Sequence, residues 1–454
     1  MKKRSTFSGG IGFVLAAAGS AVGLGNIWRF PYLAAMHGGG IFILIYILFM
    51  VTFGYTVMMC EVAIGRKTGL SPIGAYGALS KKYSFIGAMA VFSSFVILSY
   101  YGVIGGWVIK YFTEYLMGST LAVSTDGFFS QFISHPTQPL VWFFIFMLIT
   151  YIIVLCGVEK GIEKVGKILM PILVVLLVAI SVYCAFLPGA FDGIKYLLVP
   201  DFSRFSPMTI LAALGQMFYS MSLAMGIMIT YGSYLKKEND IEKSVKRIEF
   251  FDAGIAILAA MMIIPAIFSF SSGDEALLAA SLNKGPGLMF VTLPKVFASM
   301  RGGAIVGAAF FILVFFAALT SAISLMESAV CTLCDNKKIK RPMASLIVAL
   351  AAFVVGVPSS LGNGVWASFK ILGMDFLTFF DFFVNALLMP AGAFLTCIFI
   401  GYIVKADVVC DEVKLSSPFK REKMFKIILK YVAPVCILAI LISSVLEAFG
   451  ILKF

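Results

Sequence analysis

Apolar runs of about 20 residues, separated by short polar segments, dominate the chain. A helix needs roughly 20 apolar residues to cross a bilayer, so runs such as Ile41–Cys60 and Ala304–Leu325 predict transmembrane helices. Little sequence remains between the runs, and we therefore expect residues 1–454 to form one all-α membrane domain. We expect eleven spans, at roughly residues 9–35, 39–65, 84–117, 139–156, 164–187, 207–235, 245–271, 303–334, 342–358, 374–404 and 424–449.

The basic residues predict how the chain is oriented in the membrane. They collect in the N-terminal segment and in alternate loops, whereas residues 118–138 contain no Lys or Arg. The positive-inside rule then places the N-terminus in the cytoplasm, and an odd number of spans places Phe454 outside. The basic residues are Lys2, Lys3 and Arg4; Arg66, Lys67, Lys81 and Lys82; Lys160, Lys164 and Lys167; Lys236, Lys237, Lys243, Lys246 and Arg247; Lys337, Lys338, Lys340 and Arg341; and those between Lys405 and Lys426.

Composition supports a membrane protein and excludes several other classes. The chain is 61% hydrophobic and 13% charged, whereas about a quarter of a soluble protein is charged. The net charge of +12 is scattered over the loops, so we expect no nucleic-acid partner. A cleaved signal peptide is an alternative for the first span, but that segment carries polar residues that a leader does not need. The eight cysteines lie mostly inside spans and there are two histidines, so we expect no zinc or redox site despite the C-x-x-C at Cys331 and Cys334.

The first span contains a break at the middle of the membrane. It reads GSAVGLGNIWRFP from Gly19 to Pro31, with Asn26 and Arg29 inside the glycine cluster. Glycines weaken a helix, and irregular backbone at membrane depth is tolerated only where it lines a cavity or is buried in protein. A packing face of small residues is the alternative. The polar residues favour an unwound, functional segment.

The sixth span has a similar interruption at Tyr219–Gly226, YSMSLAMG, preceded by Gln216. It is the first span of a second group of five, so spans 1–5 (residues 9–187) and 6–10 (residues 207–404) have opposite topologies. Interrupted helices at corresponding positions of two inverted repeats indicate a binding site at the membrane midplane. Loose helix ends offer N–H groups to an anion and carbonyls to a cation.

The eighth span adds three oxygen-bearing positions on one helix face, Ala317, Thr320 and Ser321. Such oxygens suit a small, hard cation. Ser and Thr in a membrane helix more often bond to their own backbone, so the residues alone leave both interpretations open.

These strings resemble the neurotransmitter:sodium symporter family. GSAVGLGNIWRFPY, the GGG at residues 38–40 and GQMFYSMSLAMG are similar to its bacterial amino-acid members, which have the LeuT fold. The resemblance runs from about Arg4 to the tenth span, and ending after eleven spans is similar to a bacterial subset that includes the multi-hydrophobic amino acid transporter. It implies sodium-coupled symport of an amino acid by alternating access in the bacterial inner (cytoplasmic) membrane, and no enzymatic activity.

The resemblance also implies two sodium sites and a substrate site between them. One sodium ion would bind Gly19, Val22, Ala317, Thr320 and Ser321, and the other Ala21, Asn26, Ser220 and Asp252. The substrate carboxylate would complete the second site, so that substrate and sodium pair their charges. The implied substrate-binding residues are Ala21, Leu24, Gly25, Ile97, Tyr100, Tyr101, Tyr219, Ser220, Ser222, Met225 and Leu325.

Two positions indicate the substrate class and the anion requirement. Gly23 stands where monoamine transporters of the family have an aspartate, which favours a substrate with its own carboxylate. Asp252 stands where many relatives have asparagine, so its charge would replace chloride. Asp252 as the partner of a nearby basic residue is the alternative. We expect a hydrophobic or aromatic L-amino acid; osmolytes, β-amino acids and amino-butyrate stay open.

The same resemblance implies two gates. Arg29 with Asp381, aided by Gln216, would close the outer side, and Arg4 with Asp335, near Tyr234, would close the inner side; each pair could instead be a static ion pair. A channel or receptor needs polar residues along a continuous path, and a membrane enzyme needs a catalytic motif such as HExxH or GxSxG, which the sequence lacks. We therefore expect sodium, a small amino acid and the bilayer as partners, and no obligate protein partner.

Overall fold

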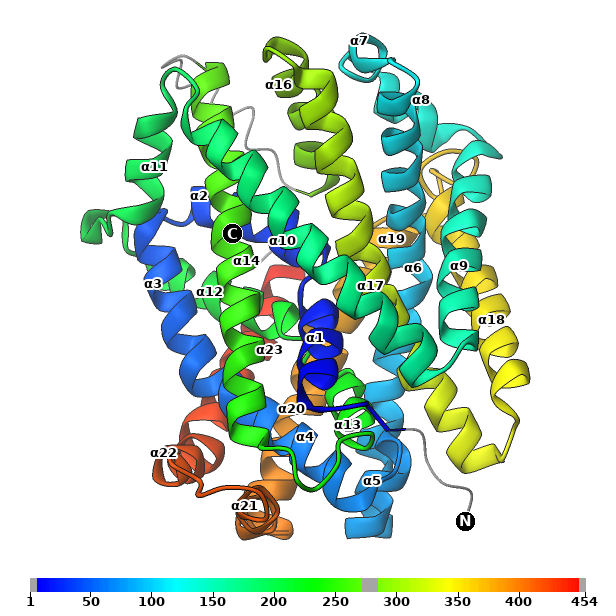
Figure 1. Cartoon of the computed structure of the whole chain (residues 1–454), viewed down its shortest axis with the longest axis vertical. Helices are drawn as coiled ribbons and strands as arrows, with labels where there is room; N and C mark the ends of the chain where they lie inside the picture. The colour runs from blue at the N-terminus through cyan, green and yellow to red at the C-terminus, as the bar shows by residue number, and fades with distance from the viewer. Residues whose placement is uncertain (1–5, 272–284, 449–454) are drawn as a thin grey trace.

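The computed structural model describes residues 6–271 and 285–448. Most helices run along the long axis of the molecule (Figure 1). Helices α5 (Pro72–Leu79), α13 (Ile227–Gly232) and α21 (Asp407–Lys414) lie at the end where the chain begins, here called the N-terminal end. The opposite end carries α7 (Thr120–Val123), α8 (Phe128–Ser134), α11 (Ala190–Leu198) and α16 (Leu293–Ser299).

Nine helices in the described residues are long and apolar enough to span a membrane, and one bent pair raises the number to ten. All of them overlap a span expected from the sequence. The remaining expected span, the sixth, corresponds to α12 (Pro207–Ser220) and α13, whose break keeps the two from counting as one continuous span. The continuous spans are Gly40–Thr68 (α3 Gly40–Phe49, η2 Met50–Gly54, α4 Tyr55–Thr68), Lys81–Leu116 (η3 Lys81–Tyr83, α6 Ser84–Leu116), Gln138–Leu155 (α9), Val158–Ala185 (η4 Val158–Glu163, α10 Lys164–Ala185), Ile241–Ser271 (α14), Gly303–Lys337 (α17), Arg341–Leu361 (α18), Phe376–Ile403 (α19 Phe376–Asp381, η7 Phe382–Leu388, α20 Met389–Ile398, η8 Phe399–Ile403) and Glu422–Leu446 (α22 Glu422–Ile427, η9 Ile428–Val432 and α23 Ala433–Ala448).

Two spans begin at least four residues earlier than the apolar pattern indicates. The fifth starts at Val158 instead of residue 164, and its first turns include the buried Glu163, which accepts a hydrogen bond from the Ser8 N–H at 2.9 Å. The seventh starts at Ile241 instead of residue 245, where the Asp240 carboxylate accepts from the N–H of Lys243 at 2.9 Å. An apolar window misses polar residues at the start of a helix, such as Asp240, whose side chain satisfies a backbone N–H of the first turn.

The first and sixth spans are broken, as expected. Helix α1 (Gly10–Ala21) ends at Val22, and η1 (Gly25–Arg29) with α2 (Phe30–Met36) continues at an angle of 55°. In the sixth span, residues 221–226 between α12 and α13 are not helical.

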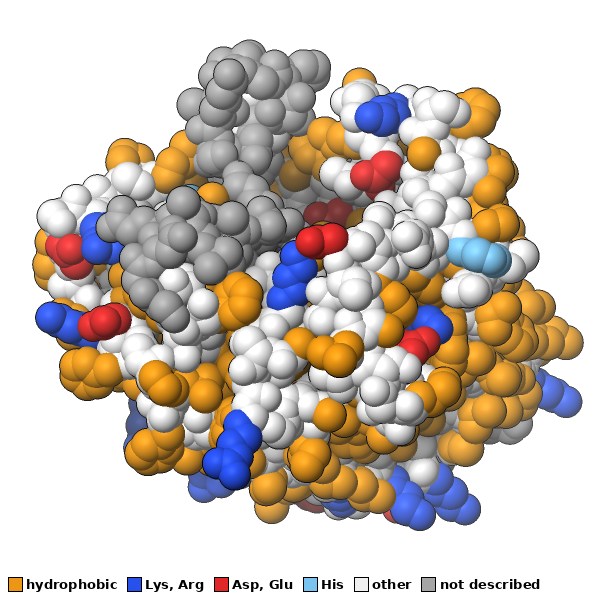
Figure 2. All heavy atoms as spheres, turned by 90° about the horizontal axis from the view of Figure 1, so that it is seen from above, with side chains coloured by type: hydrophobic (Ala, Val, Ile, Leu, Met, Phe, Trp, Pro, Cys, Tyr) orange, Lys and Arg blue, Asp and Glu red, His pale blue; other side chains and the backbone are white. Residues whose placement is uncertain are grey.

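The broken spans lie in the interior of the bundle. Helix α1 packs against α10, α14 and α17, while α6 and α17 pack along each other (Figure 1). The short elements η5 (Phe202–Arg204) and η6 (Leu288–Thr292) precede α12 and α16. Seen from the end opposite the N-terminal end, charged side chains are few and hydrophobic side chains form the rim (Figure 2). This distribution suits a bundle whose sides face lipid.

Candidate functional site

A small hollow lies where the two breaks meet. It encloses about 30 Å³. A single water molecule needs roughly 10–15 Å³ by this measure, so an amino acid enters only if side chains move. Ten of the eleven expected substrate-binding residues line it, and Tyr100 does not. The lining residues are Ser20, Ala21, Gly23, Leu24, Gly25, Asn26, Ile97, Tyr101, Tyr219, Ser220, Ser222, Met225, Ile227, Ser321 and Leu325.

The break in the first span turns backbone groups toward this hollow. The last N–H bonded within α1 is that of Val22, which donates to the Ala18 carbonyl at 2.7 Å. A helix end leaves its last four carbonyls without intrahelical donors, here those of residues 19–22. Beyond the end, the Leu24 N–H donates to the Tyr101 hydroxyl at 3.1 Å. Leu24 and Tyr101, both among the expected substrate-binding residues, are therefore in contact at the break.

The break in the sixth span is held in a strained conformation. Ser222, Ala224 and Gly226 have φ values of 53°, 57° and 70°, and the left-handed region is unfavourable for the first two by about 1–2 kcal/mol each. Specific contacts hold this backbone. The Glu61 carboxylate accepts from the Ala224 N–H at 2.8 Å, and the Ser222 hydroxyl donates to the Ser20 carbonyl at 3.1 Å. The two breaks are therefore directly bonded to each other.

The five residues expected at the first sodium site lie together. The Ser321 hydroxyl is 3.4 Å from the Gly19 carbonyl oxygen and 3.4 Å from that of Val22. It is also 3.0 Å from the carbonyl of Ser20, which the sequence reasoning did not include. The Thr320 hydroxyl is 3.1 Å from the Ala317 carbonyl oxygen. The hydroxyls of Ser321 and Ser222 supply two hydrogens to these three carbonyls, so the acceptors exceed the hydroxyl donors.

Three of the four residues expected at the second sodium site are in contact. Asp252 is completely buried, and its carboxylate accepts from the Asn26 amide at 2.7 Å and from the Ser220 hydroxyl at 2.8 and 2.9 Å. Ala21 lines the hollow beside them, whereas Asp252 lies behind that lining. The third donor is the Tyr46 hydroxyl at 3.0 Å. The sequence reasoning missed Tyr46, whose signal is a single hydroxyl in an otherwise apolar run.

The residues expected at the outer gate lie around two further cavities. Arg29 borders both, of about 230 and 400 Å³, and Asp381 lines the larger. Among the described residues Arg29 forms no ion pair with Asp381; its guanidinium stacks 5.0 Å from the centre of the Tyr219 ring. The Tyr100 hydroxyl donates to Asp381 at 3.0 Å, so Tyr100 orients this carboxylate instead of lining the hollow. The Gln216 amide donates to the Gly25 carbonyl at 2.9 Å.

At the N-terminal end the expected inner gate is seen only in part. Arg4 lies outside the described residues, and Asp335 accepts from the Ser71 N–H at 2.8 Å. The Tyr234 hydroxyl donates to Glu327 at 2.7 Å. Glu327 is buried and pairs with Arg341 at 2.5 Å. The sequence reasoning did not single out this pair.

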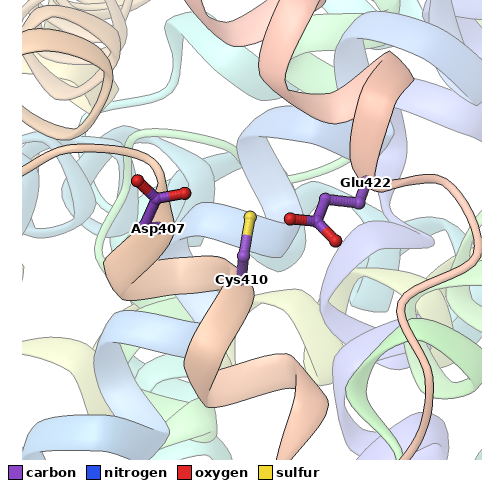
Figure 3. Close-up of side chains that lie close together, drawn as sticks. All are labelled: Asp407, Cys410 and Glu422. Atoms are coloured by element: carbon purple, nitrogen blue, oxygen red, sulfur yellow. The ribbon is translucent and has the colours of Figure 1, made fainter.

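One group of side chains has the spacing of a metal site. Asp407, Cys410 and Glu422 bring ligand atoms within 4.8 Å of one another (Figure 3). Lys426 bonds to Asp407 at 2.8 Å and to Glu422 at 2.9 Å, and Lys414 bonds to Glu422 at 2.7 Å, so two ammonium groups neutralise the two carboxylates. Burial raises the pKa of the Cys410 thiol to about 11, which disfavours the thiolate that a metal needs. We assign no metal to this cluster.

Comparison with known proteins shows to which chains this one is similar. The model of the sodium:neurotransmitter symporter family matches residues 4–125 and 127–451. The sodium-dependent transporter YhdH of Bacillus subtilis is 36% identical, and the match covers 98% of this chain and 97% of the relative. The human sodium- and chloride-dependent GABA transporter 2 is 26% identical over 78% of this chain and 67% of its own length.

A solved structure agrees over the whole fold. The crystal structure of MhsT in complex with L-phenylalanine has a TM-score of 0.88 and 38% sequence identity, and the match covers 97% of this chain and all of MhsT. This similarity confirms the expected all-α, LeuT-type fold.

Proposed function

The chain belongs to the sodium:neurotransmitter symporter family, and from that premise we propose that it carries a zwitterionic, hydrophobic or aromatic L-amino acid together with two sodium ions. The family consists of sodium-dependent membrane transporters and not of enzymes. The number of sodium ions, the substrate, independence from chloride and the orientation in the membrane are parts of our proposal.

One observation most strongly supports the coupling of transport to sodium. Carbonyl oxygens freed at the first break converge on Ser321. Three carbonyls at 3.0–3.4 Å from one hydroxyl repel one another unless a positive charge lies between them. Sodium is a hard cation that prefers such oxygen ligands. The Thr320 hydroxyl and the Ala317 carbonyl add two oxygen ligands from α17. A bound sodium ion would therefore connect α1 to α17.

Sodium and substrate bind together because the positive sodium ion and the negative substrate carboxylate attract each other. A substrate carboxylate beside the Leu24 N–H and the Tyr101 hydroxyl lies within the same hollow as Asn26 and Ser220. Each buried charge is costly alone, and contact between carboxylate and sodium reduces the cost for both. Binding of either solute therefore favours binding of the other.

The lining of the hollow supports an apolar amino acid. Ile97, Met225 and Leu325 line it, and Met adapts to side chains of different shape. A side chain at Gly23 would place its Cβ 2.7 Å from the Ser321 hydroxyl and 2.9 Å from that of Tyr101. An aspartate there would displace one of these hydroxyls, and glycine at this position favours a substrate that brings its own carboxylate. The MhsT structure contains L-phenylalanine, an amino acid of the proposed class.

The surroundings of Asp252 support transport without chloride. Three donors, from Asn26, Ser220 and Tyr46, surround its carboxylate in the interior of the bundle. A fixed negative charge there balances sodium without a free anion. The human GABA transporter 2, by contrast, is named as chloride-dependent.

We assign the gates to opposite ends of the hollow. Closure at the outer end brings Arg29, now stacked on Tyr219, to Asp381, and Gln216 stabilises the break. At the inner end Arg4 pairs with Asp335 near Tyr234. Spans 1, 2, 6 and 7 rock against the others, with the N-terminus in the cytoplasm of a bacterial cell. The charge-poor loop at residues 118–138 supports this orientation.

Uptake into proteoliposomes tests the proposal. A panel of labelled amino acids is offered with an inward sodium gradient, with equal sodium on both sides, and with gluconate in place of chloride. We expect uptake of apolar L-amino acids that depends on the gradient and persists in gluconate. Uptake that is equal without sodium contradicts the coupling, and uptake lost in gluconate contradicts the role of Asp252.

A further inference from the structure

A cavity of about 530 Å³ lies at the N-terminal end, away from the hollow described above. It is bounded by the first three turns of α14 and by the segment that joins α21 to α22 (Figure 1). Its lining consists of Asp240, Glu242, Lys243, Lys246, Arg247, Phe250, Phe251, Ser417, Pro418 and Lys420.

Positive charge in this cavity exceeds negative charge. The lining holds four cations but only two carboxylates, and both carboxylates have local partners. Glu242 pairs with Lys246 and accepts from the backbone N–H of Lys420 at 2.9 Å, while Asp240 accepts from a backbone N–H of α14.

In the part of the chain that the structure describes, the side chains of Lys243, Arg247 and Lys420 have no ion pair. The hydroxyl of Ser417, also in the lining, is buried and has no hydrogen-bond partner in the described residues. Three unpaired cations around one hollow repel one another, and an anion between them removes that repulsion.

The cations continue into an exposed apolar surface on the same helix face. Lys243, Arg247 and Phe250 are spaced i, i+4 and i+7 along α14, so their side chains project from one side. Phe250 is 77% exposed and begins the apolar part of this span. A charged turn followed by an exposed aromatic ring matches a molecule with an anionic head and an apolar tail.

We propose that this cavity binds the head group of an anionic phospholipid, with Lys243, Arg247 and Lys420 contacting the phosphate and Phe250 contacting an acyl chain. Free inorganic phosphate offers the same anionic oxygens, but it leaves the exposed ring without a partner. The proposal does not depend on which solute the central site transports.

Fluorescence quenching by brominated lipids tests the proposal on the intact protein in bilayers. A Phe250→Trp variant places a reporter at the cavity, and its signal is taken as the difference from the parent, which has four tryptophans. We expect brominated phosphatidylglycerol to quench this reporter at a several-fold lower mole fraction than brominated phosphatidylcholine. Each basic residue near an anionic surface contributes about fivefold, so Lys243→Ala with Arg247→Ala should largely remove the difference.

The controls distinguish lipid binding at the cavity from a general effect of positive surface charge. Lys81→Ala with Lys338→Ala removes the same charge from two exposed residues outside the cavity and should leave the preference unchanged. Thermal melting of each variant verifies that it is folded. Equal quenching by both lipids overturns the proposal, as does an equal loss in the control pair. Release of phosphatidylglycerol by millimolar inorganic phosphate at constant ionic strength also overturns it, because the site then binds free phosphate.

Discussion

Replacing Asp252 by asparagine removes the fixed charge beside the proposed second sodium site while keeping the size of the side chain. The two oxygens of the Asp252 carboxylate accept hydrogen bonds from three donors, on Asn26, Ser220 and Tyr46. An amide has one oxygen, and its NH₂ group would face a donor. The substitution therefore loses one acceptor and weakens the remaining hydrogen bonds, because they are no longer charge-assisted.

The expected size of the effect follows from these contacts. A hydrogen bond to a charged group contributes about 1.5–3 kcal/mol, and 1.4 kcal/mol corresponds to tenfold in affinity. We therefore expect Asp252→Asn to raise the half-saturating sodium concentration by about 10-fold to 150-fold in chloride-free buffer. The donors left without a carboxylate form a site for a free anion, so added chloride should recover part of the loss.

Sodium-dependent binding of the labelled amino acid that the uptake panel selects measures this effect on purified protein. Tyr46→Phe is the matched control, because it removes one donor and keeps the charge. It removes one hydrogen bond to the carboxylate, so the half-saturating sodium concentration should rise by up to about the same factor, but added chloride should have no effect. An Asp252→Asn protein with an unaltered sodium dependence in gluconate would refute our account of this site.

Three further substitutions test other parts of the structure. Ser321→Ala removes the hydroxyl at the proposed first sodium site and should raise the half-saturating sodium concentration by about tenfold in the binding assay. Gly25→Ala would place a Cβ 2.7 Å from the Tyr219 ring, and such overpacking of about 1–3 kcal/mol should weaken amino-acid binding by about 5-fold to 150-fold. Arg341→Ala leaves Glu327 buried without its ion pair and should destabilise the protein by about 3–5 kcal/mol, measured by thermal and denaturant unfolding.

Each of these substitutions has a control within the chain. Ser345→Ala removes a buried hydroxyl on α18, far along the sequence from both breaks, and should leave sodium dependence unchanged. Gly254→Ala adds a methyl group where no other heavy atom lies within 4 Å, so amino-acid binding should not change. Adding Glu327→Gln to Arg341→Ala removes the buried charge and should recover part of the stability. Equal behaviour of a test variant and its control would contradict the role assigned to that residue.

The sequence was sufficient to predict the spans and the two breaks. Glycines at positions 19, 23 and 25 and the polar residues among them have no function in a lipid-facing helix, so they point to an interior site. The residues carried over by resemblance are also brought together, because Ser321 and Asp252 both contact the breaks. Their roles as sodium ligands stay predictions.

The contacts between distant spans could not be predicted in the same way. Tyr46 bonds to Asp252 on another helix, and Glu327 and Arg341 also lie on different helices. The spacing of hydrophobic residues indicates which positions are buried, but not which residues they contact. The left-handed backbone at Ser222 and Ala224 is likewise absent from the pattern, because glycine is the residue that signals such a conformation. The stacking of Arg29 on Tyr219, without an ion pair to Asp381, also joins side chains of different spans, which hydrophobic periodicity does not report.

The central claim is that backbone groups freed at Val22–Gly25 and Ser220–Gly226 bind an amino acid and sodium as one unit. Equilibrium binding of the labelled amino acid to the purified protein, measured over a range of sodium concentrations at constant ionic strength, tests it most directly. Our account predicts that the dissociation constant falls steeply as sodium replaces choline. It also predicts that the amino acid raises the affinity for sodium by the same factor. An amino acid that binds equally well in choline and in sodium would contradict it.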